Sequence, residues 1–222
     1  MWRLRLRRLV YARRTAGTAL QRCWQTPLPA TGTDWRRVSF LVVDAEMSSL
    51  DVREGELLSV GWVAVEAGGI RLDSARHYLV KAQKSVGQSA TIHSLRDCEL
   101  RDAQSGDRVL AHFLEAAAGK VLVFHNAALD LAFLNRVSKE AFKAPILLPA
   151  VDTLLQEEAL LRRREQPIRP GDLRLHACRE RYGLPPYQGH NALLDALATA
   201  ELLLALVAHR SGGRPFPLRQ LL

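Results

Sequence analysis

The chain has 222 residues, 48% of them apolar and 24% charged, and a formal net charge of +8, which is enough for one substantial core. Its three cysteines, Cys23, Cys98 and Cys178, lack metal-ligand spacing and indicate free thiols in a reducing compartment, without a disulfide framework. The most apolar late stretch contains Asp195 and Glu201, so we expect a buried helix there and no membrane span.

The excess positive charge lies at the start of the chain. Residues 1–37 hold nine arginines and one acid, Asp34, whereas residues 38–222 hold 22 basic and 22 acidic residues. A link rich in Pro, Gly and Thr, at residues 25–33, separates the charge from the rest. We therefore expect a basic arm (1–37), a single domain (38–210) and a tail (211–222).

Three interpretations of the arm stay open. In the favoured one, Leu6, Leu9 and Val10 pack a helix on the domain while the arginines face water. In the second, the arginines contact nucleic-acid phosphates. In the third, the arm resembles a mitochondrial presequence, whereas Arg13 and Arg14 interrupt any apolar core and exclude a secretory signal.

The first informative pattern is a buried strand that ends in acids. Residues 38–43 are short, apolar and rich in β-branched residues, which predicts a strand covered on both faces, at 38–45. Asp44 and Glu46 are two residues apart, so in an extended chain both project from one face. Two adjacent carboxylates repel each other unless a cation lies between them. The plain alternative is a solvated turn in which one acid caps a neighbour.

The second pattern is a strand that runs into a helix. Residues 120–124 predict the strand, and His125 or Asn126 opens a helix that ends near Phe142. Asp130 shares a helix face with Phe133 and Leu134, so it points toward the core. A buried Asp satisfied by amides or an arginine is as good an interpretation as a metal ligand.

The third pattern is a turn followed by an Ala/Leu-rich helix at 191–209. Asp195 lies on the apolar face of this helix, and His190 comes five residues earlier. That spacing separates the two by about 140° in a continuous helix, so they share a site only if His190 lies in the loop ahead of the first turn. The glycines and prolines of residues 183–189 permit this.

Together the three patterns resemble the DEDDh 3′→5′ exonucleases, a superfamily that includes the proofreading subunits of DNA polymerases. The resemblance covers roughly residues 38–208, and it is supported by residues 58–61, 92–95 and 151–153. It implies an α/β fold similar to ribonuclease H, with a mixed five-stranded sheet flanked by helices. The expected strands lie near residues 38–45, 57–66, 70–80, 120–124 and 149–152.

The resemblance also implies roles for individual residues. Asp44, Glu46, Asp130 and Asp195 would hold two divalent cations, and His190 would take a proton from the attacking water. Four oxygen donors suit Mg²⁺ or Mn²⁺. Where the family often has Thr-Thr-Gly-Leu after the first motif, this chain has Met-Ser-Ser-Leu. The expected substrate contacts are Met47, Ser48, Leu50, His93 and Asn126. The first three belong to the segment that differs from the family pattern.

We therefore expect a metal-dependent 3′→5′ exonuclease that acts on DNA in a bacterial cytoplasm, with mitochondrial targeting as the alternative location. RNA or short oligonucleotides are alternative substrates, and a polymerase-associated module without activity is the rival from another class. None of the five chemical residues is missing, which argues against that rival. The tail begins as a linker and ends apolar, so it docks on its own domain or, less favoured, on a DNA polymerase. We expect no membrane partner.

Overall fold

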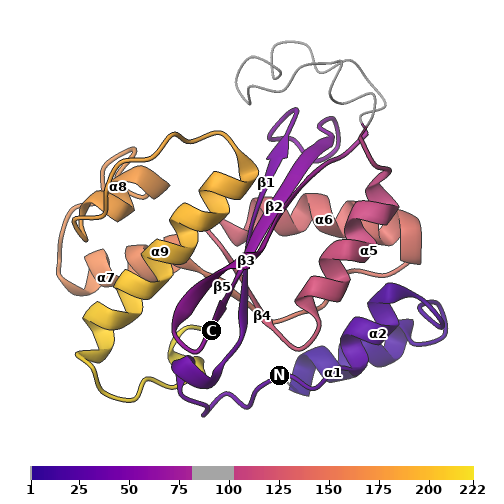
Figure 1. Cartoon of the computed structure of the whole chain (residues 1–222), viewed down its shortest axis with the longest axis horizontal. Coiled ribbons are helices and arrows are strands. Elements are labelled where there is room, and N and C mark those ends of the chain that lie inside the picture. The colour runs from indigo at the N-terminus through magenta and orange to yellow at the C-terminus, as the bar shows by residue number, and fades with distance from the viewer. Residues whose placement is uncertain (1, 82–102) are drawn as a thin grey trace.

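The computed structural model describes residues 2–81 and 103–222, and it places five strands in one sheet (Figure 1). The strands are β1 (Phe40–Met47), β2 (Leu57–Glu66), β3 (Gly69–Leu79), β4 (Val121–Phe124) and β5 (Ala150–Asp152). Their order is β3-β2-β1-β4-β5. The β1–β2 and β2–β3 pairs are antiparallel, and β4 pairs in parallel with β1 and β5. The predicted mixed five-stranded sheet is confirmed.

Alternation along β1 divides the buried side chains into two cores. Leu41 and Val43 belong to one core, and Phe40 and Val42 belong to the other. Both faces of β1 are therefore covered, which explains why the strand is a continuous apolar run. Asp44 and Glu46 continue the even-numbered set and lie on the same face as Phe40 and Val42.

Helices cover the two faces of the sheet (Figure 1). They are α5 (Gly106–Ala117), α6 (Ala127–Phe142), α7 (Thr153–Arg163), α8 (Leu175–Glu180) and α9 (Ala192–Ser211). Helices α5 and α6 contribute Phe113 and Phe133 to the first core, and α9 contributes Leu203 and Leu206 to the second. The face that carries Asp44 and Glu46 is therefore the face that α9 covers.

Helix α9 is the only helix among the described residues that is long and apolar enough to cross a membrane by composition. Half of its apolar window is buried inside the protein. Leu202, Leu203 and Leu206 are fully buried, and the helix packs against β1 and β2. These contacts identify α9 as a core helix, as the sequence predicted.

The arm is packed against the domain through two helices, α1 (Trp2–Tyr11) and α2 (Ala19–Gln25). Leu20 and Cys23 of α2 are buried in the first core. Helix α1 is held by Arg8, whose guanidinium donates to the carbonyl of Leu147 at 2.9 and 3.1 Å and to that of Trp24 at 3.1 Å. The favoured interpretation, that the arm packs, is therefore correct.

The prediction of which side chains of α1 contact the domain was wrong. Leu6, Leu9 and Val10 are 54, 70 and 73% exposed. The side of α1 that faces the domain carries Leu4, Arg8 and Tyr11 instead, which are partly buried. Periodicity showed that α1 has an apolar stripe, but it could not show whether that stripe or the opposite side meets the domain.

The tail docks on its own domain, which was the favoured expectation. Phe216, Leu218 and Leu221 are buried in the second core. The chain is tied to the link before β1, where Trp35 donates to the carbonyl of Phe216 at 2.9 Å. Trp35 is itself buried in that core, so the packed domain begins before residue 38. Since these apolar side chains lie inside the protein, they are not a surface for a polymerase.

Candidate active site

Asp44 and Glu46 lie at the end of β1 on the face that α9 covers. A carboxylate oxygen from each, and one from Asp195 of α9, lie within 4.8 Å of one another. Glu46 is buried, while Asp44 and Asp195 are partly buried. Residues 149 positions apart in sequence thus form one group of oxygen donors.

Asp130 reaches the same region from α6. Strand β4 ends at Phe124, and its last pairing with β1 joins Val123 to Val42. Beyond this point β1 has no strand beside it on the β4 side, and the N–H of Ala45 donates to Asp130 Oδ1 at 3.0 Å. The carboxylate of Asp130 therefore occupies the place that a longer β4 would fill with a backbone carbonyl.

Gly61 on β2 lets the first turn of α9 approach the sheet. It pairs with Asp44, and a Cβ built at this position would lie 2.3 Å from the backbone nitrogen of Leu193. Any side chain here would push α9 away from β1. The absence of a side chain at Gly61 thus brings Asp195 to Asp44.

His190 lies outside α9, as the shared site required. The helix begins at Ala192 and is capped by Asn191, whose side chain accepts from the N–H of Leu193 at 3.1 Å. His190 is exposed and has φ +67°, a left-handed conformation that is uncommon for residues other than glycine. This turn separates the direction of His190 from the helix that carries Asp195.

Tyr187 is a site residue that sequence reasoning missed. Its hydroxyl donates to Asp195 Oδ1 at 2.7 Å, and the N–H of Asn191 donates to Asp195 Oδ2 at 3.0 Å. The guanidinium of Arg179 lies 5.0 Å from the ring centre of Tyr187. The only signal in the sequence was an aromatic residue in the Pro-Pro-Tyr-Gln-Gly turn before His190.

The environment makes ionisation of these acids costly. Burial raises the pKa of Asp44 well above its ordinary value, and the negative charges of Asp130, Asp195 and Glu46 raise it further. Burial also raises the pKa of Asp130 to about 8, although the hydrogen bond from Ala45 acts against this. For Asp195 burial raises the pKa, and the hydrogen bonds from Tyr187 and Asn191 oppose the shift. In the part of the chain that the structure describes, Asp44, Asp130 and Asp195 form no ion pair that would offset these costs.

A cavity of about 980 Å³ opens beside this group. Asp195, His190, Tyr187 and Asn126 line one part of it. The other wall comes from the loop before α8 and the start of that helix, and it includes Arg169, Arg174 and His176. The cavity therefore joins the acidic group to a basic wall.

The other predicted contacts differ in accessibility. Asn126 lines the cavity, and its backbone is left-handed (φ +83°) where β4 passes into α6. Leu50 is 78% exposed, whereas the side chain of Met47 is buried in the first core. Ser48 uses its hydroxyl to accept from the N–H of Glu56 at 2.8 Å. His93 lies outside the described residues.

Residues 151–153 hold the start of α6 in place through hydrogen bonds. Asp152 accepts from the N–H groups of Asn126 and Ala127 at 3.1 and 2.9 Å. The ring of His125 lies 2.8 Å from both the hydroxyl of Thr153 and the carbonyl of Leu173. These bonds fix the start of α6, which carries Asp130, against the loop that forms the basic wall.

Comparisons with known proteins agree with this geometry. A family model described as Exonuclease (RNase T) matches residues 41–203. "DNA polymerase III PolC-type" of Thermotoga petrophila is 28% identical over 79% of this chain, which spans 12% of that relative's length. "DNA polymerase III subunit epsilon" of Treponema pallidum is 26% identical, over 80% of this chain and 83% of the relative.

Solved structures share the fold. E. coli exonuclease I in complex with a 5cy-dT13 oligonucleotide has a TM-score of 0.65 at 16% identity, covering 79% of this chain and 42% of that one. Cell-death related nuclease 4 has a TM-score of 0.68 at 16% identity, covering 80% of this chain and 65% of that one. At these identities the likeness concerns the fold alone.

Proposed function

The chain belongs to the RNase T exonuclease family, and from that premise we propose that it removes nucleotides from the 3′ end of DNA as 5′-monophosphates. The observation that carries the proposal is the meeting of Asp44, Glu46 and Asp195 within 4.8 Å. The preference for DNA is supported by the names of the relatives, which are DNA polymerase III proteins, and by the DNA oligonucleotide bound to exonuclease I.

The donor set fits divalent cations. Asp44, Asp130 and Asp195 form no ion pair with a lysine or arginine anywhere in residues 2–81 and 103–222. Buried carboxylates of this kind are stable when ionised only if something supplies positive charge. Their ligand atoms are all oxygen, which suits Mg²⁺ or Mn²⁺ better than zinc.

Four residues would hold two such ions. Asp44, whose pKa is raised by burial and by the charges of all three other acids, would help to hold both ions, Glu46 and Asp195 would hold one of them, and Asp130 would help to hold the second. When bound, the ions supply positive charge to the attacking and leaving oxygens of an in-line displacement at phosphorus. The protein contributes the fixed positions of these carboxylates, since β1, α6 and α9 each hold one part of the set.

His190 is the general base in this proposal. It is exposed beside the cavity, so water and a phosphodiester both reach it. A neutral imidazole accepts a proton from water and returns it to solvent. Tyr187 and Asn191 hold the two carboxylate oxygens of Asp195 by hydrogen bonds, which fixes the start of α9 next to His190.

The basic wall gives the substrate strand a path. Arg169, Arg174 and His176 line the same cavity as His190, and Arg169 and Arg174 are exposed. No ion pair with an acid holds either arginine in the described part of the chain. Phosphates that precede the scissile bond would lie along this wall, while Leu50 and Asn126 contact the terminal nucleotide.

The proposal is tested with oligonucleotides labelled at either end. DNA labelled at the 5′ end should give a ladder that shortens stepwise, and DNA labelled at the 3′ end should release labelled mononucleotide at once. A chelator should stop both reactions, and Mg²⁺ or Mn²⁺ should restore them. Full activity in chelator, or mononucleotide release that starts at the 5′ end, would contradict the proposal.

The same assay distinguishes the alternatives. RNA of matched sequence and short oligonucleotides of two to five residues test the alternative substrates by their kcat/KM values. If RNA is cut faster than DNA, the enzyme is an exoribonuclease. Association with a polymerase is a secondary proposal, suggested by the names of the relatives; its contact surface would have to lie outside the buried side chains of the tail.

A further inference from the structure

Helix α1 turns an apolar stripe toward solvent. Trp2, Leu6, Leu9 and Val10 are 66, 54, 70 and 73% exposed. At the angular step of an α-helix they fall within about 100° of arc. A single exposed leucine needs no explanation, but a contiguous stripe on a packed helix indicates a surface that binds something apolar.

The direction of this stripe is fixed by the other side of the helix. Arg8 holds α1 to the carbonyls of Leu147 and Trp24, and its guanidinium lies 5.6 Å from the ring centre of Trp24. Leu4 and Tyr11 lie on the same side and are partly buried. Rotating the stripe inward would break these contacts, so its exposure follows from how α1 is attached.

Arginines border the stripe on both sides. At the same angular step Arg5 lies on one margin, and Arg3 and Arg7 lie on the other. Residues 1–33 contain seven arginines and no acid. None of those arginines takes part in an ion pair with a described residue. The partner must therefore combine an apolar interior with a negatively charged surface.

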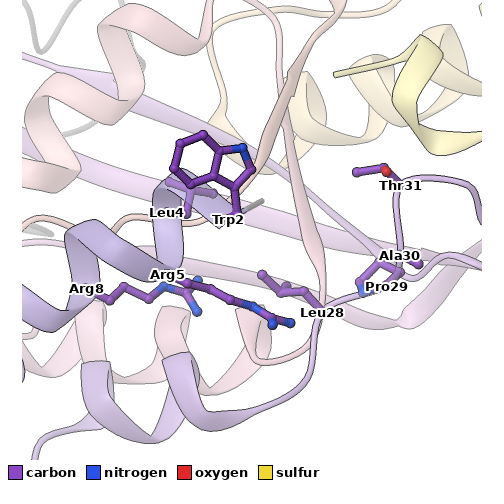
Figure 2. A pocket seen from close by; sticks show the side chains of 8 residues that line it. All are labelled: Trp2, Leu4, Arg5, Arg8, Leu28, Pro29, Ala30 and Thr31. Carbon is purple, nitrogen blue, oxygen red and sulfur yellow. The ribbon is translucent and has the colours of Figure 1, made fainter.

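A cavity of about 390 Å³ next to the stripe also combines apolar walls with arginines. Trp2, Leu28 and Pro29 give it apolar walls, and Arg5 and Arg8 supply positive charge. Figure 2 shows the side chains of Arg5 and Arg8 extending toward Leu28 on the facing segment. Burial lowers the pKa of Arg8, and the positive charge of Arg5 lowers it further. Arg8 donates to the carbonyls of Leu147 and Trp24, so Arg5 is the arginine of this cavity that stays exposed to an anionic group.

The arm lies away from the acidic group. Thr26, just after α2, lies beside Gly119, two residues before β4, where a Cβ built on the glycine would be 3.0 Å from the Thr26 methyl group. The acids lie at the opposite end of the parallel strands β1 and β4. In Figure 1 α1 and α2 lie at the lower end of the sheet, and the first turn of α9 lies at the upper end. A nucleic-acid strand bound in the active site is thus not the partner that this stripe fits.

We propose that α1 binds the surface of an anionic lipid bilayer, with its apolar stripe in the interface and its arginines on the headgroup phosphates. An amphipathic helix that has Trp and Leu on one face and arginines at the margins of that face fits such an interface. The binding is peripheral and revises the expectation that the protein has no membrane partner. It rests on the arm alone and holds whether or not the chain cuts nucleic acid.

Vesicle flotation with the full chain tests the proposal. The protein should float with vesicles of phosphatidylcholine and phosphatidylglycerol, and stay behind with phosphatidylcholine alone. Leu6→Ser with Leu9→Ser should lower the partition coefficient about tenfold for each leucine. Arg3→Gln with Arg7→Gln should lower it about fivefold for each arginine. All four side chains are exposed, so the variants keep the fold.

Matched controls use residues of the same type elsewhere. Leu72→Ser with Leu155→Ser changes leucines that are 67 and 55% exposed, and Arg108→Gln with Arg214→Gln changes exposed arginines; both should bind as the parent does. Equal binding to neutral vesicles, or equal loss in the controls, overturns the proposal.

Two further outcomes identify other occupants. If Leu6→Ser with Leu9→Ser converts a dimer to a monomer, the stripe binds a second copy. If the arginine variant lowers affinity for single-stranded DNA while vesicle binding is unchanged, the arm binds nucleic acid. Either result overturns the lipid proposal.

Discussion

Glu157 and the group formed by Asp44, Glu46, Asp130 and Asp195 are both acids inside the protein, but their surroundings differ. Glu157 is fully buried and accepts from Arg181 at 2.9 and 3.1 Å and from the hydroxyl of Tyr182 at 2.5 Å. For Asp44, the charges that raise the pKa, after the larger effect of burial, come from Asp130, Asp195 and Glu46. The acid that stabilises the fold has its counter-charge in Arg181, whereas Asp44, Asp130 and Asp195 form no ion pair with a lysine or arginine of residues 2–81 and 103–222.

The largest expected effect is a loss of catalysis and of metal binding in a variant that still folds. Asp44→Asn should lower kcat by more than about 10⁴-fold, because the carboxylate that neighbours all three other acids loses its charge. The parent should gain about 2.7 kcal/mol of stability at a metal concentration one hundred times Kd, and the variant should gain little. Thermal unfolding with and without Mn²⁺ measures this. A variant that keeps the full metal-induced gain would show that Asp44 is no ligand.

The second effect separates the base from the ligands. His190→Ala should lower kcat by about 10²–10⁴-fold and leave the metal-induced rise in Tm unchanged, since the imidazole acts on water. His112→Ala, at a partly exposed histidine on α5, is the matched control and should keep full activity. Parent-like cleavage by His190→Ala would remove the general-base role.

The third effect is a loss of stability when Glu157, the buried acid paired with Arg181, is replaced. Glu157→Gln should cost about 3 kcal/mol of unfolding free energy, because a buried pair loses one charge while Arg181 keeps some contact with water. Its neighbour Glu158, in a surface pair with Arg162, is the control, and Glu158→Gln should cost less than about 1 kcal/mol. Urea unfolding measures both. If kcat falls in Glu157→Gln while stability does not, the division between the two kinds of acid is wrong.

The smallest effect is a dependence of stability on pH. Since burial raises the pKa of Asp130 to about 8, the protonated form favours the fold. That contribution is complete below the ordinary pKa of an Asp and is lost as pH rises to about 8. Without metal, Asp130→Asn should therefore be more stable than the parent at pH 5, by about 1–2 kcal/mol, and equal to it at pH 3. Equal Tm values at both pH values would contradict this.

Much of the site could be predicted because its acids interrupt otherwise apolar patterns. Alternation placed Asp44 and Glu46 on one face, and helical periodicity placed Asp130 and Asp195 toward the core. The contact of Tyr187 with Asp195 could not be predicted, since it depends on the path of an irregular loop. The exposure of Leu6 and Leu9 also could not be predicted, because an apolar pattern defines one face of a helix but does not show what that face contacts.

The tie between the tail and the link before β1 makes the two ends of the packed domain neighbours in space. Leu218 donates to the carbonyl of Thr33 and Arg219 to that of Thr31, at 2.9 and 2.8 Å. A domain whose ends lie together can be inserted into a loop of another protein, or circularly permuted, without stretching either connection. The same closure lets the fold serve as an interchangeable cassette within longer polypeptides.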